Sequence, residues 1–105
     1  MVELAAALGE DPLFVSRTLR SFTRAGRLVS IPARDRKKRV VLRWLCDRLF
    51  PEARVYDEPE TNALIATVHP DTAALRRYLV DGHLLRRDAG RYSRVSGGDA
   101  DRVRG

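Results

Sequence analysis

HPDTAALRRYLVDGHLLRRDAGRYSRV, residues 69 to 95, predicts a helix followed by a β-hairpin. Asp71 is a favourable N-cap residue, and Gly82 is a favourable residue for ending a helix. Residues 83 to 95 have the pattern of two strands joined at Asp88-Ala89-Gly90, a three-residue loop with glycine at the position that needs a positive φ. The rest of the chain has to supply the elements that pack on this helix and hairpin.

Two helices are predicted at the N-terminus. The first spans residues 2 to 9 and ends at Gly9. The second begins after Asp11, with Pro12 in its first turn, and runs to about residue 24. Ala25-Gly26 closes it, with Gly26 at the C′ position, and residues 27 to 32 are expected to be extended because Pro32 disfavours a helical conformation at the residue before it.

The third predicted helix spans residues 36 to 49 and is capped by Asp35. Its apolar side chains recur at helical spacing and form one face: Val41, Leu42, Leu45, Cys46 and Leu49. The opposite face is charged: Arg36, Arg39, Arg43 and Asp47. After an extended stretch at residues 53 to 56, Asp57 and Glu60 have the spacing of a capping box and start a fourth helix at residues 58 to 68.

Residues 36 to 95 thus read as helix, short strand, helix, helix and hairpin, which is the element order of a winged helix-turn-helix. The predicted fold class is mainly α with a small β-hairpin (α+β). We expect an N-terminal helical pair resembling a helix-turn-helix at residues 1–31, a winged-helix domain at residues 32–96, and a disordered tail at residues 97–105, where the sequence is small and polar.

Composition excludes several classes of function. The net charge is +6, with 20 Lys+Arg against 14 Asp+Glu, which is compatible with phosphate contacts. The chain lacks an apolar run of roughly 18 residues and a secretory leader, so we expect a soluble, cytoplasmic protein with no membrane partner. Cys46 has no second thiol, and neither His69 nor His83 has a partner at metal-ligand spacing. With no catalytic constellation either, we expect no metal, no cofactor and no enzyme activity.

The sequence resembles known bacterial proteins in two parts of the chain. GRLVSIPARDRKKRVVLRWL, Tyr56, Asn62 and the opening stretch resemble the bacterial family called domain of unknown function 2087, over about residues 22 to 96. The family often occurs in proteins described as transcriptional regulators, and the resemblance implies a small winged-helix-like domain. Upstream, LAAALGEDPLFVSRTLRSFTRAGRLV resembles the helix-turn-helix half of bacterial repressors. Because a first helix is missing there, this part is either a truncated reader, with Ser16, Arg17 and Arg20 exposed, or a helical pair that packs on the main domain.

The basic run PARDRKKRVVLRWL, residues 32 to 45, is unusual because cations near a helix start oppose the macrodipole. Arg36, Arg39 and Arg43 belong to the charged face and need no function to explain them. Lys37 and Lys38 lie where the free N–H groups of a helix start would favour an anion. We therefore expect these two lysines to meet a phosphate.

The sequence favours a DNA-binding transcriptional regulator, acting on double-stranded DNA as a homodimer. The helix at about residues 71–81 would enter the major groove, with the wing at residues 84–95 on the backbone. The residues expected near base edges are Thr72, Arg76 and Arg77. Those expected at phosphates are Lys37, Lys38, Arg39, Arg86, Arg87 and Arg91. The arginines of the hairpin have an alternative, a role as cross-strand surface partners of Asp88 and other residues, and the wing role is preferred for them: Arg86, Arg87, Arg91 and Arg94. The alternatives are a non-catalytic protein-interaction module with an acidic partner and, as a third, RNA binding.

Overall fold

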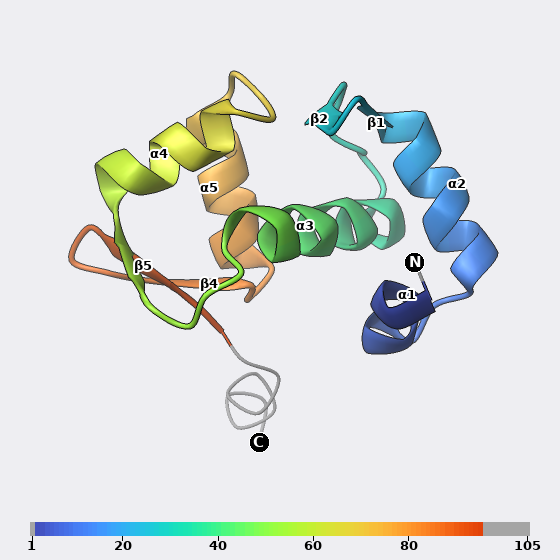
Figure 1. Cartoon of the computed structure of the whole chain (residues 1–105), viewed down its shortest axis with the longest axis horizontal. Coiled ribbons are helices and arrows are strands. Elements are labelled where there is room, and N and C mark those ends of the chain that lie inside the picture. Colours follow the sequence, from blue (N-terminus) through green and yellow to red (C-terminus); the bar gives the residue numbers. More distant parts are fainter. Residues whose placement is uncertain (1, 96–105) are drawn as a thin grey trace.

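A computed structural model describes residues 2–95, which form five helices and two antiparallel sheets (Figure 1). The predicted α+β class is therefore confirmed, while the predicted tail at residues 97–105 lies outside the described residues. None of the helices within residues 2–95 is long and apolar enough to cross a membrane. The helices are α1 (Val2–Leu8), α2 (Pro12–Phe22), α3 (Asp35–Leu49), α4 (Glu58–Ala66) and α5 (Thr72–Asp81). The strands are β1 (Thr23–Arg24), β2 (Arg27–Leu28), β3 (Val55–Asp57), β4 (Leu85–Asp88) and β5 (Arg91–Arg94).

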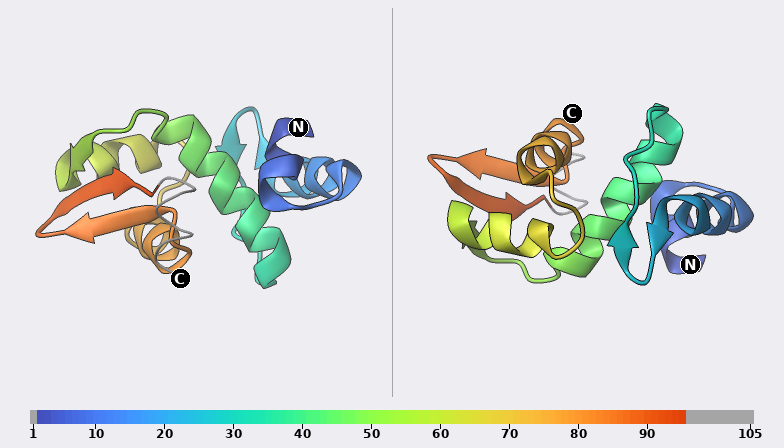
Figure 2. Two further views of the ribbon diagram at one scale, coloured as in Figure 1. Left: turned by 90° about the horizontal axis from the view of Figure 1, so that it is seen from below. Right: turned by 90° about the horizontal axis from the view of Figure 1, so that it is seen from above.

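The central helix is α3. It has α1, α2 and the β1–β2 hairpin on one side and α4, α5 and the β4–β5 hairpin on the other (Figures 1 and 2). Because α3 is covered from two sides, it buries a wider arc than one apolar stripe, and Val40, which the predicted face left out, is fully buried. One hydrophobic cluster joins Ala5 of α1 to Leu75 of α5 through α3. The predicted domain boundary at residues 31/32 falls between β2 and α3.

Helix starts follow the sequence at three of the four predicted caps. The side chains of Asp11, Asp57 and Asp71 each accept a hydrogen bond from a backbone N–H in the next helix, at 2.8 to 3.1 Å. The predicted cap Asp35 is wrong, because α3 begins at Asp35 and the N-cap position is Arg34, which makes no side-chain cap bond. Asp35 instead places a negative charge in the first turn, where the helix dipole favours it.

The end of α2 differs from the prediction. α2 ends at Phe22 instead of residue 24, and Gly26 is not a C′ residue but the second turn residue of the β1–β2 hairpin. Ala25 and Gly26 both have positive φ, 54° and 77°, the pattern of a two-residue type I′ turn. Such a turn reverses the chain with the twist that antiparallel strands need, so residues that would end a helix begin a hairpin instead.

The second hairpin uses the same turn. Ala89 and Gly90 have φ of 52° and 77°, and Asp88 pairs directly with Arg91. The loop therefore has two residues where three were predicted, although the expected positive φ at Gly90 is confirmed. The fourth helix is also shorter than predicted, since α4 ends at Ala66.

The three-stranded sheet has the order β3-β5-β4. Tyr56 of β3 pairs with Tyr92 of β5, which pairs with Arg87 of β4, so these three residues share one face. Both tyrosines are buried, which makes this the face toward the helices. The next row, Asp57, Arg91 and Asp88, lies on the opposite face. The register alone therefore places neighbouring arginines of the β4–β5 hairpin on different faces of the sheet.

Burial of Cys46 on α3 raises the pKa of its thiol from an ordinary 9.0 to about 11. Between these values the thiol of the unfolded chain ionises first, so the free energy of unfolding falls as pH rises from 9 to 11 and is unaffected below pH 9. The expected loss between pH 8 and 10.5 is about 2 kcal/mol. Chemical denaturation of wild type and Cys46→Ala at both pH values measures it, since the variant lacks this loss. Parallel pH profiles for the two proteins would contradict the assignment.

Candidate nucleic-acid interface

A groove of about 300 Å³ lies between α5 and the β4–β5 hairpin, and we call it the α5–hairpin groove. Its walls carry three arginines against one carboxylate. Arg87 reaches it because it shares the inner sheet face with Tyr92, while helical spacing places Arg77 and Asp81 on the same side of α5. The lining residues are Ala73, Arg76, Arg77, Val80, Asp81, Arg87 and Tyr92. The groove therefore joins the predicted reader helix to the predicted wing.

Two hydrogen bonds shape the wall of this groove. The guanidinium of half-buried Arg76 donates to the amide oxygen of Asn62 on α4. The Tyr92 hydroxyl donates to a carboxylate oxygen of Glu58 at 3.1 Å, and burial together with this bond raises the pKa of Tyr92. α4 thus orients the guanidinium of Arg76. Asn62, one of the residues that carried the family resemblance, therefore lies at this groove.

The other two arginines of the groove are exposed and form no ion pair among residues 2–95, although Asp81 lines the same groove one helical turn after Arg77. Within residues 2–95 no carboxylate oxygen lies within 4.0 Å of the guanidinium nitrogens of Arg77 or Arg87. Thr72, the third predicted reader, is half-buried in the first turn of α5. Arg77 and Arg87 are consequently the groove cations that are available to an anionic ligand.

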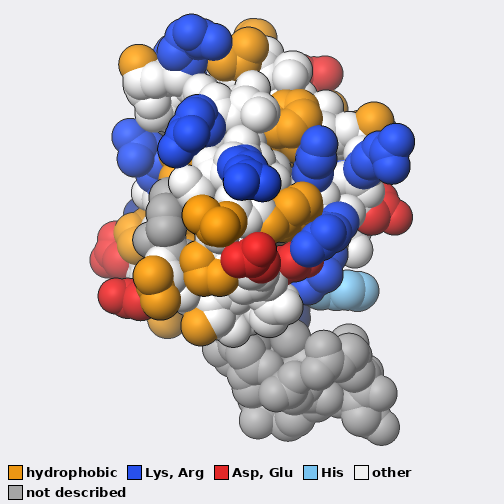
Figure 3. Space-filling model, turned by 90° about the vertical axis from the view of Figure 1, so that its right-hand side faces the viewer, with side chains coloured by type: hydrophobic (Ala, Val, Ile, Leu, Met, Phe, Trp, Pro, Cys, Tyr) orange, Lys and Arg blue, Asp and Glu red, His pale blue; other side chains and the backbone are white. Residues whose placement is uncertain are grey.

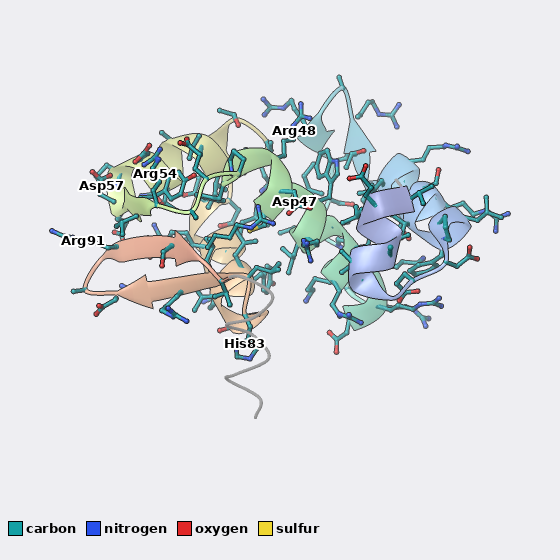
Figure 4. The ribbon with its side chains drawn as sticks, turned by 60° about the horizontal axis from the view of Figure 1, so that its bottom comes forward. Asp47, Arg48, Arg54, Asp57, His83 and Arg91 are labelled. Carbon is teal, nitrogen blue, oxygen red and sulfur yellow. The ribbon has the colours of Figure 1, made fainter. Side chains whose placement is uncertain are left out.

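The remaining exposed arginines of the β4–β5 hairpin differ from Arg87. Arg86 and Arg91 are exposed on the outer sheet face, and Arg91 stands in register between Asp57 and Asp88. Figure 4 shows Asp57 and Arg91 at the same end of the sheet. Two neighbouring carboxylates offset the charge of Arg91, so it is a poorer phosphate ligand than Arg86 or Arg87.

Arg94 is occupied inside the fold. Its guanidinium donates to the carbonyl oxygens of Cys46 and Phe50, at 3.3 and 3.0 Å, and pairs with Asp47. These acceptors lie at the C-terminal end of α3, so Arg94 caps that helix. Of the two predicted roles, pairing with groups of this chain is closer to this arrangement than contact with a phosphate.

The basic run at residues 34–39 is divided among several partners. The Lys37 ammonium lies 6.0 Å from the ring centre of Phe22 on α2, whereas that of Lys38 lies 4.5 Å from the ring centre of Tyr78 on α5. The two lysines therefore point to opposite sides of α3. Lys38 and exposed Arg39 border a second cleft of about 410 Å³, beside the C-terminal end of α5.

Arg36 has a partner that the sequence did not indicate. Its Nε and Nη2 donate to both carboxylate oxygens of Glu10 at 3.0 and 2.8 Å, and its guanidinium lies 3.8 Å from the ring centre of Phe14. The pair lowers the pKa of Glu10 and raises that of Arg36. Helical periodicity placed Arg36 on a solvated face, and only the tertiary packing of α2 on α3 brings Glu10 to it.

The predicted N-terminal reader residues lie on α2, on the other side of α3 from the α5–hairpin groove. Arg17 and Arg20 are exposed and Ser16 is half-buried. Within residues 2–95 no three His, Cys, Asp or Glu side chains come together as a metal site.

Residues 27–94 match the model of a family described as "Uncharacterized protein conserved in bacteria (DUF2087)". The match covers most of the segment over which the resemblance was predicted. Neither a curated protein nor a solved structure matches the chain. The comparisons therefore supply a family and leave the function to be derived from the geometry.

Proposed function

Because the chain belongs to the uncharacterised bacterial family DUF2087, we propose its function from its own geometry: it binds duplex DNA, as a transcriptional regulator, through the α5–hairpin groove. The proposed role is non-catalytic. The observation that carries it is the pair of exposed arginines, Arg77 and Arg87, that face one groove from a helix and from a hairpin and form no ion pair within residues 2–95.

The order of elements supports a winged helix-turn-helix. α3, β3, α4, α5, β4 and β5 follow one another, and the returning hairpin adds its strands beside β3 in the order β3-β5-β4. In helix-turn-helix proteins the second helix of the pair lies in the major groove and contacts base edges. α5 is that second helix here, and the β4–β5 hairpin is the wing beside it. A fold alone does not determine a function, so the proposal rests on the arginines of the α5–hairpin groove.

The arginines of the groove have distinct proposed roles. Arg77 and Arg87 neutralise phosphates, which supplies affinity without regard to sequence. Arg76 is held by Asn62, so its guanidinium is oriented before DNA arrives, and together with Thr72 it is the candidate for base contacts. Lys38 and Arg39 share the cleft at the C-terminal end of α5 with Asp35 and Asp81, so they are secondary candidates for phosphate contacts.

Neutralising Arg77 and Arg87 tests this site. The variant Arg77→Gln with Arg87→Gln should lose about tenfold or more in affinity for any duplex at about 0.1 M salt, because two phosphate contacts disappear. The matched control is Arg43→Gln with Arg54→Gln, which removes the same charge from side chains already paired with Asp47 and Glu60 at 3.1 and 2.5 Å. Fluorescence anisotropy with a labelled duplex measures both.

The control should stay close to wild type. Equal affinities of the two variants would remove the α5–hairpin groove as the binding site. A wild-type protein that binds no duplex at low salt would favour the alternative, a protein-interaction module whose arginines meet an acidic partner.

A further inference from the structure

The two sides of α3 are built alike. The N-terminal unit, residues 2–28, has a helix, a turn, a second helix and a hairpin, and the C-terminal unit, residues 58–94, has the same order. Each second helix is capped by an aspartate at equivalent positions, Asp11 and Asp71, and each hairpin turns at Ala-Gly with two positive φ angles. No internal repeat was predicted from the sequence, because the equivalence lies in burial and backbone geometry.

Buried positions match between the units. Ala5, Val15 and Leu19 are buried in the N-terminal unit, and the residues sixty positions later, Ile65, Leu75 and Leu79, are buried in the C-terminal unit. By the same offset, exposed Arg17 of α2 is the counterpart of exposed Arg77 of α5. α2 therefore presents to solvent the face that α5 presents in the proposed DNA site.

Within the N-terminal unit, α2 and the β1–β2 hairpin form a basic surface, whereas the acidic residues Glu3, Glu10 and Asp11 lie in α1 and the turn before α2. Residues 12–28 contain four arginines and no Asp or Glu, and all four arginines are exposed: Arg17, Arg20, Arg24 and Arg27. Figure 3 views this end of the molecule, where Lys and Arg side chains spread over the upper part of the face and acidic side chains lie mostly lower. By contrast, residues 72–94 contain two aspartates among their six arginines.

The two units are fixed to each other. The backbone N–H of Leu28 donates to the carbonyl of Val68 at 2.9 Å, and Arg27 donates to the carbonyl of Thr67 at 3.2 Å. These bonds join the β1–β2 hairpin to the turn that precedes α5. On the other side, Arg36 ties the turn before α2 to the start of α3 through Glu10. The backbones that carry the two basic surfaces are therefore held in place before a ligand binds.

We infer that the N-terminal unit is a second duplex-DNA surface, in which α2 and the β1–β2 hairpin contact phosphates through Arg17, Arg20 and Arg24. The inference rests on the proposed function for its ligand, and it adds a second set of phosphate contacts to the same duplex, from the other side of α3. A polyanion is the partner that these exposed arginines fit, because none of the four forms an ion pair within residues 2–95. DNA is the polyanion chosen because the unit repeats the construction of the C-terminal one.

Salt titrations of matched variants separate this inference from the proposed function. One labelled duplex of about 20 base pairs is titrated with five proteins at several salt concentrations. These are wild type, Arg17→Gln/Arg20→Gln, Arg77→Gln/Arg87→Gln, the variant that combines these four substitutions, and the Arg43→Gln/Arg54→Gln control. Arg17→Gln/Arg20→Gln and Arg77→Gln/Arg87→Gln should each weaken binding about tenfold or more at about 0.1 M salt and flatten the log-log salt slope by about 1.8. The variant with all four substitutions should show both losses. Circular dichroism verifies that each variant keeps its helices.

The outcomes distinguish the two claims. Wild-type-like binding by Arg17→Gln/Arg20→Gln, with weakened binding by Arg77→Gln/Arg87→Gln, overturns the second surface and leaves the proposed function intact. The reverse result supports the N-terminal surface and overturns the α5–hairpin groove. Absence of binding by the wild-type protein at low salt overturns both.

Discussion

Phe50→Ala is expected to lower the free energy of unfolding by about 3 to 5 kcal/mol, the range for removing a fully buried aromatic side chain. Phe50 follows the last turn of α3, is completely buried, and meets the Tyr56 ring edge to face at 5.0 Å. Its backbone N–H still reaches the Cys46 carbonyl after the change, so the loss reports the ring. Urea denaturation at neutral pH measures it.

Val55→Ala is the matched control for Phe50→Ala. Val55 lies in the strand that Phe50 supports, but it is 55% exposed, so truncating it should change the free energy of unfolding by no more than about 0.5 kcal/mol. A similar small change for both variants would mean that the contact between the end of α3 and the sheet does not hold the C-terminal unit together.

Arg94→Ala is expected to cost about 3 kcal/mol of unfolding free energy. The change removes charge-assisted hydrogen bonds to two carbonyls at the end of α3 and the ion pair with Asp47, and hydrogen bonds to charged groups contribute about 1.5 to 3 kcal/mol. A cation at a helix C-terminus also interacts favourably with the helix dipole. The two carbonyl acceptors of Arg94 lie more than 40 residues away along the chain, so its hydrogen bonds to them form only when the tertiary structure is in place.

The control for Arg94→Ala comes from the same hairpin. Arg86 is exposed on the outer face of the sheet, and Arg86→Ala removes the same charge without touching α3. Its effect on thermal and urea unfolding should be within about 0.5 kcal/mol. If the two variants unfold together, Arg94 is not the cap of α3.

The helix starts and the second hairpin could be predicted from local sequence, whereas the first hairpin could not. Asp11, Asp57 and Asp71 mark helix starts because a cap is a short-range hydrogen bond that the sequence displays. Ala25-Gly26 could end a helix or turn a hairpin, since both need positive φ at glycine. The choice is made by Leu28, which is buried and bonds to Val68 forty residues later.

The candidate site was predictable where a side chain's direction follows from its own element. Helical spacing on α5 and alternation on β4 bring Arg77 and Arg87 to one groove. Partners that come from distant elements were not predictable: Asn62 for Arg76, Glu10 for Arg36 and the end of α3 for Arg94. The interpretation of the basic run at residues 34–39 differs most from the prediction. α2 and α5 approach α3 from two sides, so Lys37 lies near α2 and Lys38 near α5.

The salt dependence of wild-type binding to a duplex of random sequence tests the central claim most directly. Counterion release gives a log-log slope of about −0.9 for each phosphate contacted, so Arg77 and Arg87 together predict a slope of about −1.8 or steeper. Anisotropy titrations between about 0.02 and 0.2 M salt give that slope. A slope near zero, or no binding at the lowest salt, would contradict DNA recognition through the α5–hairpin groove.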